Sequence, residues 1–211
     1  MPSYATGRIP PDLVRRGRVL RPADAEGIYA HPRPEFRRLE DAGALHRLAS
    51  GQYAVVPDDM VGTNWLPDLE AVAIGIATAG GRPDSAALMG ISAARIHDAI
   101  PRVINIATVA VAHHRRDITL VDRDAEILFV RRNLATLDLQ RQHTELATGW
   151  VTTIEQTALD LIARPQLGGA PDAAEEAVDA LLSRSDLDLL LELAQQQHRR
   201  ATVERALAAR N

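Results

Sequence analysis

The sequence predicts an α+β protein, and three observations carry that prediction. Residues 13–56 contain two short helical segments followed by a hairpin, residues 103–130 are rich in β-branched residues, and helical periodicity returns from Thr152. The order of elements in the first segment is that of a winged helix-turn-helix. We therefore expect an N-terminal winged helix-turn-helix domain over residues 1–62. Residues 63–211 are then expected to form a mixed α/β domain with a small antiparallel sheet and a C-terminal helical bundle.

Proline and glycine mark the two N-terminal helices. Pro22 can occupy the first turn of a helix, where its missing N–H group costs nothing. A second helix is expected to start near residues 32–34, with Phe36 and Leu39 on one face because they lie three residues apart. Gly43 follows where a helix C-terminus favours a left-handed residue. The sequence thus predicts a helix-turn-helix here.

A hairpin is expected directly after the second helix. The strand-like runs 44–48 and 52–56 flank a short connection at residues 49–51 that contains a glycine. Regular periodicity then stops over residues 56–67, which hold two prolines, a glycine and two aspartates. We place the domain boundary in this interruption.

The second domain is expected to mix helices and strands. Its strands are predicted at residues 103–113, 118–121 and 127–130, as an antiparallel sheet of three or four strands. Its helices are predicted from periodicity and capping residues at 66–79, from 86 onwards, at 92–100, from 152 to about 164, and at 172–182, 186–197 and 199–209. Ser92 is the expected cap of the helix at 92–100, and Thr153 is placed to cap the helix that follows Thr152.

Charge divides unevenly along the chain. All 24 basic residues are arginines, against 28 acidic residues. Residues 13–53 hold eight arginines and five acids, whereas the chain after Gly62 holds fifteen arginines and twenty acids. Arginine binds phosphates and guanine edges in bidentate fashion, so the local excess of positive charge favours a nucleic-acid partner for the first domain.

Composition also excludes several classes of protein. Without cysteine there is no disulfide, no thiolate metal site and no cysteine nucleophile. The N-terminus lacks the pattern of a secretory leader, and the longest apolar run, residues 69–79, is too short for a bilayer core of about 30 Å. We expect a cytoplasmic protein without a membrane partner.

Enzyme interpretations are not favoured. His113 and His114 are adjacent on a predicted strand, so their rings point to opposite faces and do not chelate one ion easily. Asp122 and Asp124 have the spacing that nucleotidyltransferases use for metals, but the Gly-Ser signature expected upstream is missing. A chain without lysine also lacks the acid-x-lysine pair of a nuclease. We expect no catalytic activity, no cofactor and no metal.

Two blocks of the sequence resemble the AbiEi-type antitoxins of type IV toxin–antitoxin systems. The first block comprises RRGRVLRPADAEGI and PEFRRLEDAGALHRLASGQYAVV, and it is similar to the family's DNA-binding module. The second comprises MGISAARIHDAIPR and VTTIEQTALDLIARP, of which the Glu155-Gln156-Thr157 and Leu159-Asp160-Leu161 pattern is the more specific.

This resemblance implies a protein with two roles. The N-terminal domain would repress its own operon by binding inverted repeats in promoter DNA, and the C-terminal domain would counter a cognate AbiEii-like nucleotidyltransferase toxin. Members of the family differ on whether antitoxin and toxin touch. The alternative from another class is a stand-alone winged-helix transcriptional regulator whose C-terminal domain senses a ligand or dimerises.

Winged-helix geometry assigns DNA-binding roles to side chains of the first domain, because the second helix enters the major groove and the wing reaches the neighbouring backbone. The expected readers of bases or phosphates are Arg33, Arg37 and Arg38 on the helix, Arg47, Ser50 and Gln52 on the wing, and Arg15, Arg16 and Arg18 near the first helix, which would grip phosphate. The alternative is a solvated face in which the arginines pair with Glu35, Glu40 and Asp41.

An acidic surface is the candidate toxin contact. An enzyme that acts on RNA presents positive charge, which a negative domain can cover. The expected residues are Asp172, Glu175, Glu176, Asp179, Asp186 and Asp188 on the terminal helices. The apolar faces of these helices are a second possibility, and a merely solvated acidic face is a third.

Overall fold

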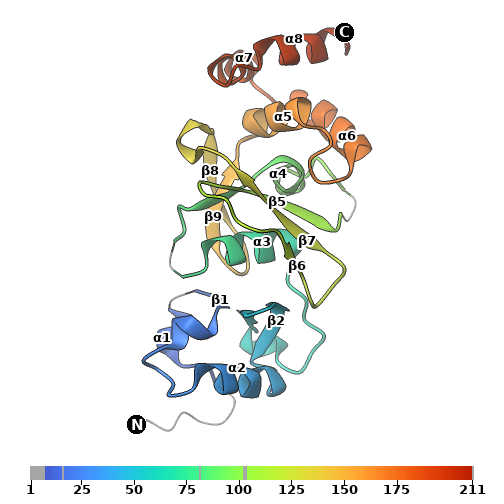
Figure 1. Ribbon diagram of the computed structural model, residues 1–211. Helices are drawn as coiled ribbons and strands as arrows, with labels where there is room; N and C mark the ends of the chain where they lie inside the picture. Colours follow the sequence, from blue (N-terminus) through green and yellow to red (C-terminus); the bar gives the residue numbers. More distant parts are fainter. Residues whose placement is uncertain (1–7, 16, 81, 102–103, 211) are drawn as a thin grey trace.

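The computed structural model describes residues 8–15, 17–80, 82–101 and 104–210. An N-terminal unit, residues 8–62, lies at one end of the molecule, a six-stranded sheet lies in the middle, and the last helices lie at the other end (Figure 1). We call the part after residue 62 the C-terminal unit. The predicted α+β class is confirmed.

The N-terminal unit combines short helices with a three-stranded antiparallel sheet of order β1-β3-β2. Its elements are α1 (Pro11–Val14), β1 (Val19–Leu20), the 3-10 helix η1 (Pro22–Ala25), α2 (Pro32–Asp41), β2 (Leu45–Ala49) and β3 (Gln52–Val55). The helix expected at Pro22 is only this 3-10 turn, because Asp24 accepts a hydrogen bond from the backbone of Arg21 (2.8 Å) and Gly27 soon takes a positive φ of 83°. The second helix and the hairpin are confirmed.

Helix α2 ends as its sequence predicts. Gly43 has a φ of 72°, its amide donates to the carbonyl of Glu40 (2.9 Å), and the amide of Ala44 donates to that of Leu39 (2.9 Å). These two bonds form the Schellman motif that satisfies the last carbonyls of a helix. The motif turns the chain directly into β2, so it fixes the angle between helix and hairpin.

The sheet of the C-terminal unit is larger than expected and is not purely antiparallel. Its order is β6-β7-β5-β4-β9-β8, and the pairs β5–β7 and β4–β9 are parallel. The strands are β4 (Ala86–Leu88), β5 (Ile106–Val111), β6 (Ile118–Thr119), β7 (Glu126–Arg131), β8 (Leu139–His143) and β9 (Thr148–Thr152).

Three of these strands correct the sequence prediction. Residues 86–88 were expected to begin a helix but form a central strand, fully buried, because three apolar residues show no period that distinguishes the two structures. Strands β8 and β9 were not expected. Strand β8 lies at the sheet edge and reads Leu-Gln-Arg-Gln-His, so it lacks the alternation of a half-buried strand.

The helices are close to their predicted positions. They are α3 (Leu69–Thr78), α4 (Gly90–Ile96), α5 (Ile154–Ala163), α6 (Pro171–Leu182), α7 (Leu187–Gln196) and α8 (Arg200–Ala208), with short 3-10 turns η2 (Asp58–Met60) and η3 (Leu134–Thr136). The Thr153 side chain caps α5 by accepting from the amide of Gln156 (3.3 Å), as expected. The α4 N-cap is Met89, and not the expected Ser92.

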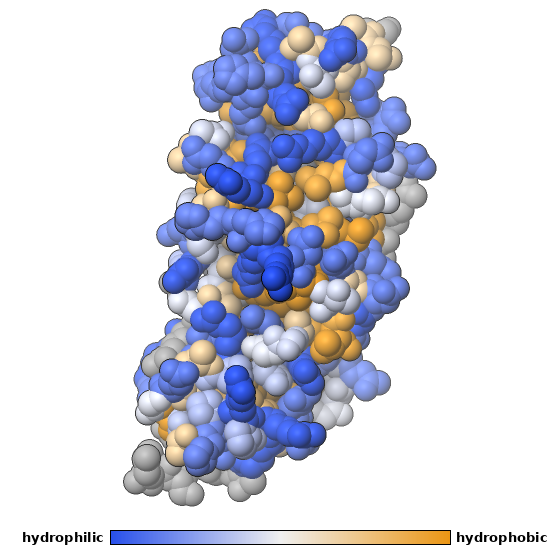
Figure 2. All heavy atoms as spheres, viewed as in Figure 1, coloured by the Kyte–Doolittle hydropathy of each residue, from blue (hydrophilic) through white to orange (hydrophobic). Residues whose placement is uncertain are grey.

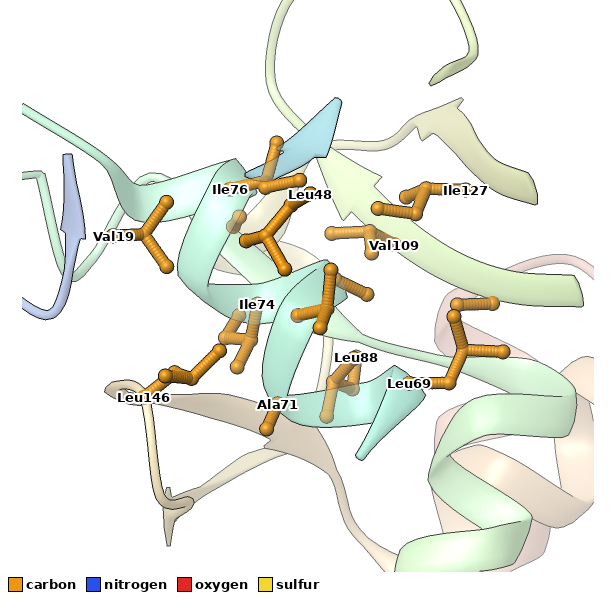
Figure 3. Packing of buried hydrophobic residues seen from close by; sticks show 14 of the residues in the cluster. Val19, Leu48, Leu69, Ala71, Ile74, Ile76, Leu88, Val109, Ile127 and Leu146 are labelled. Atoms are coloured by element: carbon orange, nitrogen blue, oxygen red, sulfur yellow. The ribbon is translucent and has the colours of Figure 1, made fainter. Parts of the chain in front are cut away.

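The two units share a hydrophobic core. Val19 of β1 and Leu48 of β2 pack into the cluster that holds α3 against the sheet, with Leu48 beside Ile76 (Figure 3). A Cβ at Gly75 of α3 would lie 2.5 Å from a methyl carbon of Val19. Glycine at this position therefore permits the close approach of α3 to the N-terminal unit.

Among the described residues, none of the helices combines the length and apolar character that crossing a membrane requires.

Candidate nucleic-acid interface

Helix α2 has one buried and one exposed face. Phe36 and Leu39 are fully buried, and the ring of Phe36 packs edge-on against Tyr53 of β3 with centroids 5.3 Å apart. Arg33 and Arg37 are exposed on the opposite side. Packing against the hairpin therefore presents the polar face of α2 outward, at the end of the molecule far from α8 (Figure 1).

The expected DNA-binding arginines fall into two groups. Arg38 forms an ion pair with Glu35 (2.8 Å), and Arg15 pairs with Asp12. The side chains of the other group form no ion pair or hydrogen bond with any described residue, and its members are Arg18, Arg33, Arg37 and Arg47. Arg16 lies outside the described residues. Pairing thus occupies only part of the positive charge, and within the described ranges Glu40 and Asp41 form no ion pair with these arginines.

A hollow of about 590 Å³ lies where α2 begins. Its walls include Arg33, His31, Arg21 and Gly51 of the hairpin turn. A hydrogen bond from Arg21 to Asp24 (2.7 Å) raises the arginine pKa, so this guanidinium stays charged. Arg21 and His31 were not among the expected residues, because only the fold brings the η1 turn, the start of α2 and the hairpin turn together.

The hairpin residues do not all join this hollow. Ser50 is exposed at the turn, and Gln52 is half-buried with an Oε1 atom that has no partner among the described residues. Arg47 is exposed but lines a different hollow, of about 620 Å³, together with Glu40 and Gly43. The structure therefore groups Arg33 with the turn and places Arg47 nearer the junction of the two units.

That junction contains a buried carboxylate. Asp122 bonds to His46 of β2 (2.8 Å) and to Arg123 (3.0 Å), and its side chain is 3% exposed. Burial would raise the pKa of Asp122, but the hydrogen bonds from His46 and Arg123 outweigh it and leave the pKa below its ordinary value. Asp122 therefore links the two units, and Asp124 is exposed nearby.

The acidic residues expected to meet a toxin lie at the other end of the molecule. Four of them form an exposed stripe along α6, and they are Asp172, Glu175, Glu176 and Asp179. Asp179 bonds to Arg210 (2.5 Å). Asp186 caps α7 by accepting from the amides of Asp188 (3.0 Å) and Leu189 (3.2 Å), and Asp188 is exposed in the first turn. The apolar face of α6 is buried against α5 and is not a free surface.

Surface hydropathy follows the same division. Hydrophilic side chains predominate at both ends of the molecule, whereas apolar residues gather over its middle on the face shown in Figure 2. Within the described ranges, no group of three or more histidines and acidic residues is arranged to hold a metal ion.

Comparisons with known proteins relate the chain to a solved structure. No family model matches it, and no curated protein matches it either. Among solved structures, the crystal structure of the Rv2827c protein from Mycobacterium tuberculosis is similar, with a TM-score of 0.50 over 93% of this chain and 78% of that one. Sequence identity is 18%, so the similarity concerns the fold alone.

Proposed function

We propose that residues 1–62 form a winged helix-turn-helix that binds promoter DNA, and that the chain is the antitoxin of a toxin–antitoxin system. The observation that carries the DNA-binding half is the outer face of α2. It exposes Arg33 and Arg37 without partners among the described residues, and its apolar face is anchored on the hairpin. The resemblance to AbiEi-type antitoxins supplies the second half of the proposal.

Docking would follow the usual geometry of this motif. A helix in the major groove presents its outward residues to base edges, and arginine bonds guanine through two donors. Arg37, in the middle of α2, is then the best candidate for reading a base, and Arg33 for the backbone at the helix start. Arg18, which precedes β1, would hold phosphate and carry no sequence information.

Toxin neutralisation would use the acidic surface of the C-terminal unit. Asp172 and Glu175 on α6 and Asp188 on α7 are exposed and form no ion pair with any described residue. A nucleotidyltransferase that acts on RNA needs positive charge at its substrate site, so these carboxylates are electrostatically suited to cover it. We propose direct contact through this stripe.

Fluorescence anisotropy with promoter DNA and with a scrambled duplex tests the DNA-binding half. We expect Arg37→Ala to weaken binding to the promoter by about 1–3 kcal/mol and to reduce the preference for it. Arg18→Ala should weaken both duplexes alike and lower the slope of log affinity against log salt by about one. Arg116→Ala, an exposed arginine of the C-terminal unit, is the control. Equal binding of both duplexes by the unaltered chain would contradict the proposal.

Co-purification with the product of the neighbouring gene tests the antitoxin half. The full chain should form a complex with a nucleotidyltransferase, and Asp172→Asn with Glu175→Gln should weaken it, whereas Glu204→Gln on α8 should not. Absence of a complex at about micromolar concentration would overturn direct contact. Arg37→Ala in the full chain should still restore growth, because neutralisation does not need DNA.

A stand-alone regulator is distinguished by the same growth experiment. Such a protein has no toxin to neutralise. Deletion of its gene should therefore not impair growth, whether or not the neighbouring gene is present. The full chain is used because Val19 and Leu48 pack against α3, and neither unit has a complete core by itself.

A further inference from the structure

A buried polar network connects the end of β7 with helices α5 and α7. Arg132 donates to Oδ1 of Asp160 (2.9 Å) and to Oε1 of Gln197 (2.9 Å). Gln197 donates to Gln156 (2.6 Å), and Gln156 donates to Oδ1 of Asp160 (3.2 Å). Asp160 and Gln156 belong to the TIEQTALDL block of the sequence, and neither DNA binding nor the acidic stripe uses them.

The two carboxylate oxygens of Asp160 differ in their hydrogen bonding. The Asp160 side chain is 3% exposed, both of its hydrogen bonds reach Oδ1, and Oδ2 has no partner among the residues that the structure describes. Buried polar atoms are nearly always satisfied, because loss of hydration is unfavourable without a replacement bond. Oδ2 is thus a buried acceptor whose hydrogen bond is missing among the described residues.

Asp160 lies on the wall of a hollow between the ends of α5 and α7 and the start of α8. The hollow has a volume of about 260 Å³, and we call it the Asp160 pocket. Arg164 and Arg199 also line it, and neither side chain forms an ion pair or hydrogen bond with any described residue. The pocket therefore combines one buried acceptor with two free guanidinium groups.

Charge defines what this pocket can bind. Asp160 matches the charge of Arg132, so Arg164 and Arg199 contribute two unmatched positive charges to the wall. Guanidinium groups bind phosphate and carboxylate through paired N–H donors. A phosphate monoester carries about −1.5 to −2 near neutral pH, which fits two guanidinium groups better than a single carboxylate does.

We propose that the Asp160 pocket binds a small phosphate monoester. The phosphate contacts Arg164 and Arg199, and a hydroxyl or amino group of the same molecule donates to Oδ2 of Asp160. The volume suits a compact molecule such as a sugar phosphate, since pockets for drug-sized ligands start at about 300 Å³. This inference does not depend on DNA or toxin binding, because none of the residues proposed for those contacts lines the pocket.

Isothermal titration calorimetry on the full chain in chloride buffer, with ribose 5-phosphate as the probe, tests the proposal. We expect saturable binding at one site, weaker binding of inorganic phosphate, which lacks the sugar hydroxyls, and no binding of ribose. Failure of every phosphate probe to bind at up to about 10 mM would overturn the proposal. Succinate binding as tightly as ribose 5-phosphate would overturn the preference for phosphate.

Two variants and a control locate the site. Arg164→Ala and Arg199→Ala should each weaken ribose 5-phosphate binding roughly tenfold or more, because each removes a charged hydrogen-bond donor. Arg205→Ala on α8 lies outside the pocket and should leave binding unchanged. All three arginines are exposed, so circular dichroism should report intact folds. An equal effect of Arg205→Ala, or undiminished binding after both pocket substitutions, would contradict the assignment.

Discussion

The N-terminal unit keeps its ion pairs near the surface, whereas the C-terminal unit buries several of its own. Arg38 of α2 is 41% exposed and its partner Glu35 34% exposed, only three residues away. Arg132 and Asp160 are 18% and 3% exposed and lie 28 residues apart in the sequence. The first pair can open to meet a partner at little cost, and the second holds two segments of the fold together.

The difference separates two roles of arginine that composition alone cannot distinguish. An exposed ion pair contributes little free energy, because water already screens the charges. Little stability is therefore lost when a ligand replaces one of its members. A buried pair leaves an uncompensated charge when one member is removed. Three substitutions test this contrast, and the expected loss of stability falls from the first to the last.

The largest effect is expected at Arg132. We predict that Arg132→Ala lowers the free energy of unfolding by about 3–5 kcal/mol at neutral pH, because it strands the buried carboxylate of Asp160. Urea denaturation followed by circular dichroism measures this. Arg131→Ala changes the neighbouring exposed arginine and is the matched control. If Arg132→Ala lost no more unfolding free energy than Arg131→Ala, the contrast between buried and exposed ion pairs would be wrong.

Acid should partly rescue the Arg132→Ala variant. Burial raises the pKa of Asp160 in the fold, and Arg132 opposes that rise. Without Arg132 the pKa rises further, so the folded state binds the proton more tightly than the unfolded state does. Stability of the variant relative to the unaltered protein should therefore improve as pH falls from neutrality towards the ordinary carboxyl value of about 3.9.

A smaller effect is expected at the junction. Asp122→Asn weakens the bonds to His46 and Arg123 and should lower the unfolding free energy by about 1.5–3 kcal/mol at neutral pH. The pKa of Asp122 is depressed in the fold, so its contribution is present above about 3.9 and disappears as pH falls through the lower folded value. Unfolding curves at several pH values test this, with Asp124→Asn as control. If the difference in unfolding free energy between Asp122→Asn and the unaltered protein did not change with pH, the role assigned to the Asp122 carboxylate would be wrong.

The smallest effect is expected at Arg38. Its pair with Glu35 is an exposed one, so Arg38→Ala should change the unfolding free energy by only about 0.2–1 kcal/mol. Thermal denaturation at low and high salt measures it, and salt should remove most of the difference. A loss comparable with that of Arg132→Ala would show that burial does not govern these pairs.

Local chemistry predicted much of the fold. Three helix ends depend on single residues that act at short range. Pro32 begins α2, Gly43 ends it with a positive φ, and Thr153 caps α5. Strand β4 escaped prediction because Ala86–Leu88 is too short to show a period. The parallel pairing of β4 with β9 joins residues more than sixty positions apart, and the sequence contains no turn signal that indicates it.

The two candidate sites also differ in how far the sequence predicts them. Arginines on the outer face of α2 could be predicted, because that face is defined by Phe36 and Leu39 three residues apart. The Asp160 pocket could not, because its walls come from the end of β7, from α5 and from the α7–α8 connection. Only the fold shows that Arg164 and Arg199 lie beside the same buried carboxylate.

The core shared by the two units has a consequence during synthesis of the chain. Val19 and Leu48 emerge from the ribosome before α3, which covers them. Until residues 69–76 have followed, the early part of the protein exposes apolar side chains that its own sheet cannot bury. A nascent chain from which residues 19–48 but not α3 have emerged therefore offers these side chains to chaperones until α3 follows.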